Sequence, residues 1–142
     1  MKLIHVIGHS CSGKTTFIAG LIERLLPFGR VATVKHLGHH RFGLAPGKDT
    51  TVFFEHGAVI SAGIDDEKSV LSLDTTNIED ILDIYLDYGI DFVVIEGFKE
   101  TRIRGIVMGD LESSDAIFRN PTHDEVMKGI WMFPEYRRGI PE

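Results

Sequence analysis

Residues 8–15 read G-H-S-C-S-G-K-T, a full match to the pattern G-x-x-x-x-G-K-[ST]. In this pattern the backbone N–H groups of the loop surround an anion, which makes the chemistry that of phosphate binding. Lys14 is expected to reach the β- and γ-phosphates, and the hydroxyl of Thr15 is expected to ligate Mg²⁺. The residues predicted to bind a nucleotide in this loop are Gly8, His9, Ser10, Cys11, Ser12, Gly13, Lys14, Thr15 and Thr16.

The segments on both sides of this loop predict a strand before it and a helix after it. Residues 2–7 form a short, β-branched and mostly apolar run that is typical of a buried strand. From Lys14 onward, apolar residues recur at helical spacing, at Phe17, Ile18, Leu21, Ile22, Leu25 and Leu26. A helix that begins at Lys14 directs its unpaired N–H groups and positive dipole end at phosphate. The alternative is a glycine-rich turn that binds nothing, but the flanking strand and helix favour nucleotide binding.

Two other segments carry charged residues with possible roles at a bound nucleotide. Glu96 follows residues 92–95, an apolar run typical of a central parallel strand. A carboxylate at the carboxyl end of such a strand holds Mg²⁺ through water or orients an attacking water, so we predict Glu96 to be a metal-binding and catalytic residue. Asp49 is the second predicted catalytic residue, and Lys48 is predicted to contact the nucleotide. The alternative for Glu96 is a carboxylate that caps the following loop, and the alternative for Lys48 and Asp49 is a solvated turn.

Three histidines, His36, His39 and His40, lie within five residues of one another. Imidazoles at this spacing can bind a transition metal, but the sequence offers no second pair of ligands nearby. Contact with phosphate or a solvated loop is therefore the favoured interpretation. We interpret Cys11 as a small residue of the phosphate loop rather than as a reactive thiol.

Composition limits the classes of protein to which the chain can belong. Its 142 residues predict a single nucleotide-binding domain, 1–142, with residues 134–142 as a tail. No apolar stretch approaches the ~20 residues needed to span a bilayer, and no signal peptide is expected. The single cysteine predicts a reducing compartment, the cytoplasm. A net charge of −6 argues against a nucleic-acid-binding surface, so we expect neither nucleic acid nor membrane as a partner.

The remaining elements alternate between strands and helices, which predicts an α/β protein with the P-loop NTPase fold. We expect a mainly parallel central sheet flanked by helices, with an antiparallel hairpin. Two capping boxes, Thr76 with Glu79 and Thr122 with Glu125, predict helix starts. The other expected elements are a strand at 31–34, a long loop at 36–51, hairpin strands at 58–64 and 69–73, and a strand at 92–95.

Several short motifs together resemble one family over roughly residues 2–105. They are the loop of residues 8–15, V-K-H at 34–36, the pair His39-His40, P-G-K-D-T at 46–50, Gly57-Ala58, and V-I-E-G-F-K at 94–99. In this order they resemble the molybdopterin-guanine dinucleotide biosynthesis protein B (MobB) family. The resemblance implies a homodimeric, cytoplasmic protein that binds GTP and Mg²⁺. It also implies an adaptor and weak GTPase that assists the guanylyltransferase attaching GMP to molybdopterin, so that this enzyme and molybdopterin are the implied partners.

The sequence departs from the family pattern at three places. Residues 41–45 lack the expected acidic residues, and Phe54 stands where an arginine is expected. Arg104-Gly105 replaces an expected Pro-Lys pair, which leaves Arg102 or Arg104 to supply the charge. The sequence contains no Asn-Lys-x-Asp motif for reading guanine, so the preference for GTP over ATP is implied by the resemblance alone.

Three further expectations concern activity and assembly. A small P-loop kinase and a GTP-driven metallochaperone are the alternative functions. We expect slow hydrolysis because no arginine is evident in position to stabilise the transition state. We also expect a homodimer with residues 36–51 and 58–73 at its interface, because the strands of a small sheet leave an unpaired edge that a second copy can cover.

Overall fold

The computed structural model describes residues 1–38, 40 and 43–139. The chain divides into two compact units, Met1–Gly38 with Ile81–Glu142, and His39–Asp80. We call the first the sheet unit and the second the hairpin unit. The single domain expected from chain length stays a prediction.

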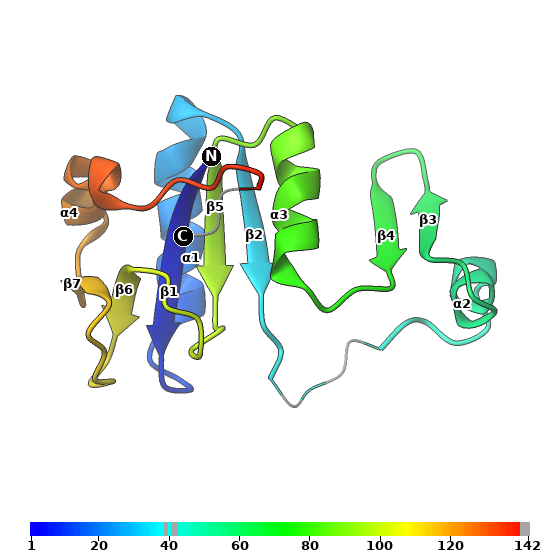
Figure 1. The fold of residues 1–142 in the computed structure, drawn as a ribbon, viewed down its shortest axis with the longest axis horizontal. Helices are drawn as coiled ribbons and strands as arrows, with labels where there is room; N and C mark the ends of the chain where they lie inside the picture. Colours follow the sequence, from blue (N-terminus) through cyan, green and yellow to red (C-terminus); the bar gives the residue numbers. More distant parts are fainter. Residues whose placement is uncertain (39, 41–42, 140–142) are drawn as a thin grey trace. The chain divides into compact units, whose positions relative to one another are not determined.

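The sheet unit contains a five-stranded sheet in the order β2-β5-β1-β6-β7 (Figure 1). Each strand is parallel to its neighbours, as predicted for the central sheet. The carboxyl ends of all five strands therefore lie at one edge of the sheet, and β1 is the middle strand. The strands are β1 (Lys2–Gly8), β2 (Val31–Lys35), β5 (Phe92–Glu96), β6 (Gly105–Met108) and β7 (Ala116–Arg119).

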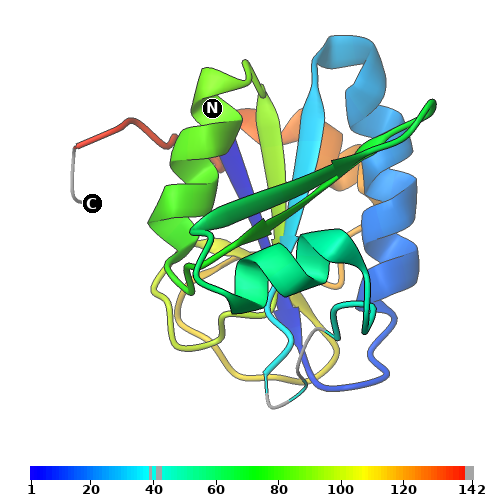
Figure 2. The same ribbon diagram turned by 90° about the vertical axis from the view of Figure 1, so that its right-hand side faces the viewer.

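Helices cover both faces of this sheet. Figure 2 shows α1 (Lys14–Leu25) and α3 (Ile78–Asp87) on opposite sides of the strands. The helix α4 (His123–Lys128) packs against α1 and begins with the predicted capping box between Thr122 and Glu125. Short 3₁₀ turns follow α1 and α4, at Leu26–Phe28 (η1) and Ile130–Met132 (η2). The arrangement confirms the predicted sheet flanked by helices.

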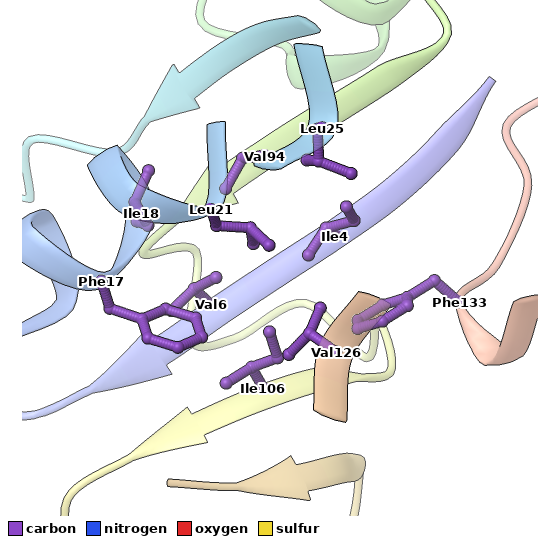
Figure 3. Close-up of a cluster of buried hydrophobic side chains, with 10 residues drawn as sticks. All are labelled: Ile4, Val6, Phe17, Ile18, Leu21, Leu25, Val94, Ile106, Val126 and Phe133. Carbon is purple, nitrogen blue, oxygen red and sulfur yellow. The ribbon is translucent and has the colours of Figure 1, made fainter. Parts of the chain in front are cut away.

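The main core lies between α1 and the sheet (Figure 3). Leu21 and Leu25 of α1 are fully buried, whereas Leu26, the last residue of the predicted apolar stripe, begins η1 and is 58% exposed. Burying a leucine side chain stabilises the fold by about 1.5–3 kcal/mol. The cluster comprises Ile4, Val6, Phe17, Ile18, Leu21, Leu25, Val94, Ile106, Val126 and Phe133. This packing fixes β1 and α1, and therefore both ends of the loop between them.

The segment after η2 contacts the start of β1 and the helix α3. Leu3 donates its N–H to the carbonyl of Pro134 at 2.9 Å, and Tyr136 donates to the carbonyl of Met1 at 2.8 Å. The Tyr136 hydroxyl also donates to Asp83 at 2.7 Å. This hydrogen bond, with smaller contributions from Arg138, lowers the pKa of the Asp83 carboxyl below its ordinary value.

The hairpin unit contains α2 (Asp49–Glu55) and an antiparallel pair of strands, β3 (Ile60–Ile64) and β4 (Ser69–Leu73). The pair confirms the predicted hairpin. The loop expected to extend from 36 to 51 is wrong at its end, because α2 begins at Asp49. No helix in the described ranges is long and apolar enough to cross a membrane.

Candidate phosphate-binding site

The loop of residues 9–13 joins the end of β1 to the start of α1, as the sequence predicted. Gly8 lies so close to β6 that a Cβ atom on it would be 2.3 Å from the carbonyl oxygen of Met108. Only a residue without a side chain fits this position. Gly13 and Cys11 both have left-handed backbone conformations, with φ of 80° and 63°. These conformations turn the chain back toward α1, whose first N–H groups have no partner within the helix.

Lys14 lies across the loop that precedes it. Its Nζ donates to the carbonyl oxygens of Gly8 at 3.2 Å and His9 at 2.6 Å, and to Ser12 Oγ at 3.3 Å. The three N–H donors of the ammonium group are thus directed at the loop, and a bound phosphate oxygen would replace one of these loop acceptors. Thr15 and Thr16 are exposed in the first turn of α1.

Glu96 is the last residue of β5, and it pairs in register with Val6 of β1 and Lys35 of β2. Its carboxylate lies at the same edge of the sheet as the phosphate loop. The Lys35 Nζ is 3.3 Å from Glu96 Oε1, and the glutamate side chain is only 16% exposed. The Lys35 side chain is 52% exposed, so water screens the ion pair from that side.

The motifs V-K-H and E-G-F contact each other through more than this ion pair. His36 donates its N–H to the carbonyl of Glu96 at 2.9 Å. The His36 ring stacks on Phe98, with ring centroids 4.7 Å apart. These contacts fix the turn that follows Glu96. No role was predicted for Lys35 from the sequence. The presence of V-K-H and E-G-F in the same chain was the signal that could have indicated a contact between Lys35 and Glu96.

A buried histidine of β1 holds the same turn from the other side. His5 is 1% exposed, and its Nε2 is 2.6 Å from the carbonyl oxygen of Gly97. Its Nδ1 is 3.0 Å from the carbonyl oxygen of Ile103. Both ends of the segment between β5 and β6 are therefore held against the central strand. The sequence gave no sign of this role, since His5 stands inside a run that reads only as a strand.

The other predicted site residues are distributed differently. Lys48 and Asp49 are exposed at the start of α2, in the hairpin unit, whereas Thr15 and Glu96 belong to the sheet unit. Of the three neighbouring histidines, for which metal binding is the less favoured interpretation, His39 lies outside the described residues. Within the part of the chain that the structure describes, no group of three His, Cys, Asp or Glu side chains is placed to hold a metal ion.

The donor atoms at this edge of the sheet suit a phosphate and a hard cation. The threonine hydroxyl and glutamate carboxylate are oxygen donors, which Mg²⁺ prefers. Gly8 has no side chain, so no Cβ atom stands between the start of the loop and β6, where the two backbones are in close contact. The residues present therefore fit Mg²⁺ and a phosphate chain.

The order of the sheet and the loop between β1 and α1 define a P-loop NTPase-like fold. Solved structures agree with this class. The crystal structure of Bacillus subtilis MobB matches with a TM-score of 0.70 and 20% identity, over 96% of this chain and 100% of that chain. A MobB homolog from Bacillus stearothermophilus matches with a TM-score of 0.59 and 23% identity, over 93% and 95% of the two chains.

Sequence comparison gives the family. The model of Molybdopterin guanine dinucleotide synthesis protein B matches residues 3–127. A putative molybdopterin-guanine dinucleotide biosynthesis adapter protein of Methanocaldococcus jannaschii is 40% identical over 124 residues, 82% of this chain and 51% of that protein. A probable adapter protein of the same name from Bacillus subtilis is 30% identical over 147 residues, 92% of this chain and 84% of that protein. The chain therefore belongs to the MobB family, and it spans about half the length of the archaeal relative.

Proposed function

We propose that this protein binds Mg²⁺·GTP and acts as an adapter in the biosynthesis of molybdopterin-guanine dinucleotide, by assisting the guanylyltransferase that attaches GMP to molybdopterin. The observation that carries the proposal is a phosphate loop with Glu96 at the same sheet edge, in a member of this family. The names of its relatives support the adapter role. The same proposal places the protein in the cytoplasm.

The residues of the sheet unit have separate roles in this proposal. The backbone N–H groups of the loop and the Lys14 ammonium bind the phosphates. Thr15 and Glu96 hold Mg²⁺, directly or through water, and the metal ion neutralises charge on the phosphate oxygens when bound. Lys35 keeps the Glu96 carboxylate in place. Contact of Lys48 and Asp49 with the nucleotide stays a prediction.

An adapter needs little intrinsic turnover, and the chain fits this expectation. Phe54 stands where the family resemblance places an arginine. An arginine that stabilises the transition state of phosphoryl transfer raises the rate by roughly 10³–10⁵-fold. We therefore propose at most weak GTPase activity.

The hairpin unit carries an apolar surface suited to a second copy of the chain. A two-stranded sheet has edges on both sides, and an isolated hairpin is only marginally stable. Large apolar side chains of β3, of β4 and of Val59, the residue before β3, are exposed, and Ile64 is 80% exposed. They are Val59, Ile60, Ile64, Val70 and Leu71. Pairing of two hairpin units would cover these groups, which supports the proposed homodimer.

Reconstitution with a purified molybdenum cofactor guanylyltransferase tests the proposed function. At limiting GTP, the protein should bind the enzyme and increase the formation of the guanine dinucleotide. The Lys14→Ala variant should bind the enzyme but give no increase, because it lacks the phosphate-binding ammonium. If the protein neither binds the enzyme nor changes product formation, the adapter function is wrong.

A further inference from the structure

The position of Glu96 indicates on which side of the phosphate loop the ribose and base of a bound nucleotide would lie. Glu96 lies on β5, on one side of the central strand β1. If the metal and the γ-phosphate are held there, as the proposed function requires, the other end of the nucleotide extends to the opposite side. On that side lie the carboxyl ends of β6 and β7. These two strands are joined by residues 109–115, which we call the β6–β7 loop.

The β6–β7 loop begins beside the phosphate loop and is held by side chains of β7 and the residue after it. A Cβ atom on Gly109 would lie 3.4 Å from Cβ of Ser12 in the phosphate loop. Asn120 accepts from the Gly109 N–H at 2.6 Å and donates to the Gly109 carbonyl at 3.1 Å. Arg119 donates to the carbonyl oxygens of Leu111 at 2.9 Å and Ser113 at 2.7 Å. A loop fixed at three carbonyls is pre-organised to present its other groups to a ligand.

This loop borders an open hollow of about 630 Å³, lined by Glu112, Ser113, Ser114 and Arg119. The groups around it combine an acceptor with donors. Glu112 supplies a carboxylate, whereas the serine hydroxyls and the remaining guanidinium N–H groups can donate. The charged side chains within the loop, Asp110, Glu112 and Asp115, are all acidic. The hollow itself places the Glu112 carboxylate beside the Arg119 guanidinium and two serine hydroxyls, a set suited to a ligand group that donates hydrogen bonds to a carboxylate and accepts them from the other groups.

Among nucleobases, guanine offers such donors side by side. Its Watson–Crick edge presents an N1–H and a 2-amino group to a single carboxylate, and its O6 accepts from a hydroxyl or guanidinium. Adenine presents an unprotonated N1 at the same place, which repels a carboxylate. A carboxylate that accepts both N–H groups therefore selects guanine.

We propose that the hollow binds the nucleobase and that Glu112 is the residue that selects guanine, with its carboxylate accepting from N1–H and the 2-amino group. This inference rests on the proposed binding of GTP. It supplies a structural basis for the preference for GTP in a chain without the Asn-Lys-x-Asp motif.

The test compares Glu112→Gln with Asp110→Asn, a matched control in the same loop. The Asp110 side chain is 97% exposed, its Oδ1 lies 3.9 Å from His9 Nε2, and it is not among the residues that line the hollow. Binding of Mg²⁺ complexes of GTP, ATP, xanthosine triphosphate and inorganic tripolyphosphate is measured by calorimetry for the wild type and both variants. Far-UV circular dichroism confirms that each variant is folded.

Glu112→Gln should weaken GTP binding by about tenfold or more, with the affinities for ATP and tripolyphosphate unchanged. The variant should gain affinity for xanthosine triphosphate, because the new amide can donate to the xanthine O2 while it accepts from N1–H. Asp110→Asn should bind all four ligands as the wild type does.

Three results would overturn the inference while the proposed function stands. They are unchanged GTP affinity in Glu112→Gln, a wild type that binds ATP as tightly as GTP, and loss of the preference in Asp110→Asn instead. A wild type that binds neither GTP nor tripolyphosphate would refute nucleotide binding itself, and this inference with it.

Discussion

Replacement of Gly8 by alanine tests whether the phosphate loop depends on the close approach of β1 to β6. The added Cβ would lie 2.3 Å from the Met108 carbonyl oxygen and 2.7 Å from Ser12 Oγ, and real Cβ atoms essentially never come within 3.0 Å of such atoms. The Met108 oxygen belongs to a paired backbone that cannot rotate away. Overpacking of this kind costs about 1–3 kcal/mol. For a chain of this size the melting temperature should fall by roughly 3–10 °C.

A second glycine provides the control for this experiment. A Cβ on Gly105 would lie 2.2 Å from the carbonyl oxygen of His5, so Gly105→Ala meets a similar clash at the other end of β6. Both variants should be destabilised, as measured by thermal unfolding. Only Gly8→Ala should also lose affinity for Mg²⁺·tripolyphosphate, because its clash distorts the loop. Wild-type stability and affinity in Gly8→Ala would refute the reasoning.

Three other outcomes are expected. Intrinsic GTP hydrolysis by the protein alone should be far slower than the ~1–10³ s⁻¹ of ordinary enzymes, and a measured rate within that range would favour an enzyme over an adapter. Light scattering at micromolar concentration, with and without Mg²⁺·GTP, should show a homodimer, and a monomer under both conditions would contradict the proposed role of the hairpin unit. Because the pKa of Asp83 is lowered in the folded state, its stabilising contact with Tyr136 should be present above about pH 3.9 and lost as the pH falls through the folded pKa. Carboxyl titration by NMR should show this, and a pKa at or above about 3.9 would contradict it.

Much of the sheet unit could be predicted because its pattern is local. The β-branched run at the start of the chain forms β1, and the apolar spacing after Lys14 forms α1. The pairing of Thr122 with Glu125 is a contact between residues three apart, so the sequence alone reveals it. The other predicted helix start shows the limit of such signals. The residue that caps α3 is Asn77, whose Oδ1 accepts from the Glu79 N–H at 3.0 Å, one position later than the expected Thr76.

The missed elements are short and have sequences that do not predict their conformation. The strands β6 and β7 have four residues each, too few for a clear pattern. The helix α2 contains Thr50, Thr51, Val52, Phe53 and Phe54, which are β-branched and aromatic types that favour strands. The helix is also held by a contact to a residue outside it, because the Thr51 hydroxyl donates to the Ala45 carbonyl at 2.9 Å.

The candidate site also has one part that could be predicted from the sequence and another part that could not. The phosphate loop is a continuous motif and could be recognised directly. The pairing of Lys35 with Glu96 depends on β2 and β5 being neighbours in register, although 60 residues separate them in the chain. The surroundings of Glu112 depend on the side chain of Arg119 and on the order of the strands. Sequence patterns report contacts along one segment, whereas these contacts depend on the topology of the sheet.

Calorimetric titration of Mg²⁺·GTP into the wild type and Lys14→Ala tests the central claim most directly. The Lys14 ammonium makes charge-assisted hydrogen bonds, which contribute about 1.5–3 kcal/mol each. The wild type should bind one nucleotide per chain, and the folded variant should bind at least about tenfold more weakly, or ~1.4 kcal/mol. Lys128→Ala, in the last turn of α4, should bind as the wild type does. Equal affinity of the wild type and a folded Lys14→Ala variant, or no binding to either, would contradict the assignment of residues 8–15 as a nucleotide-binding loop.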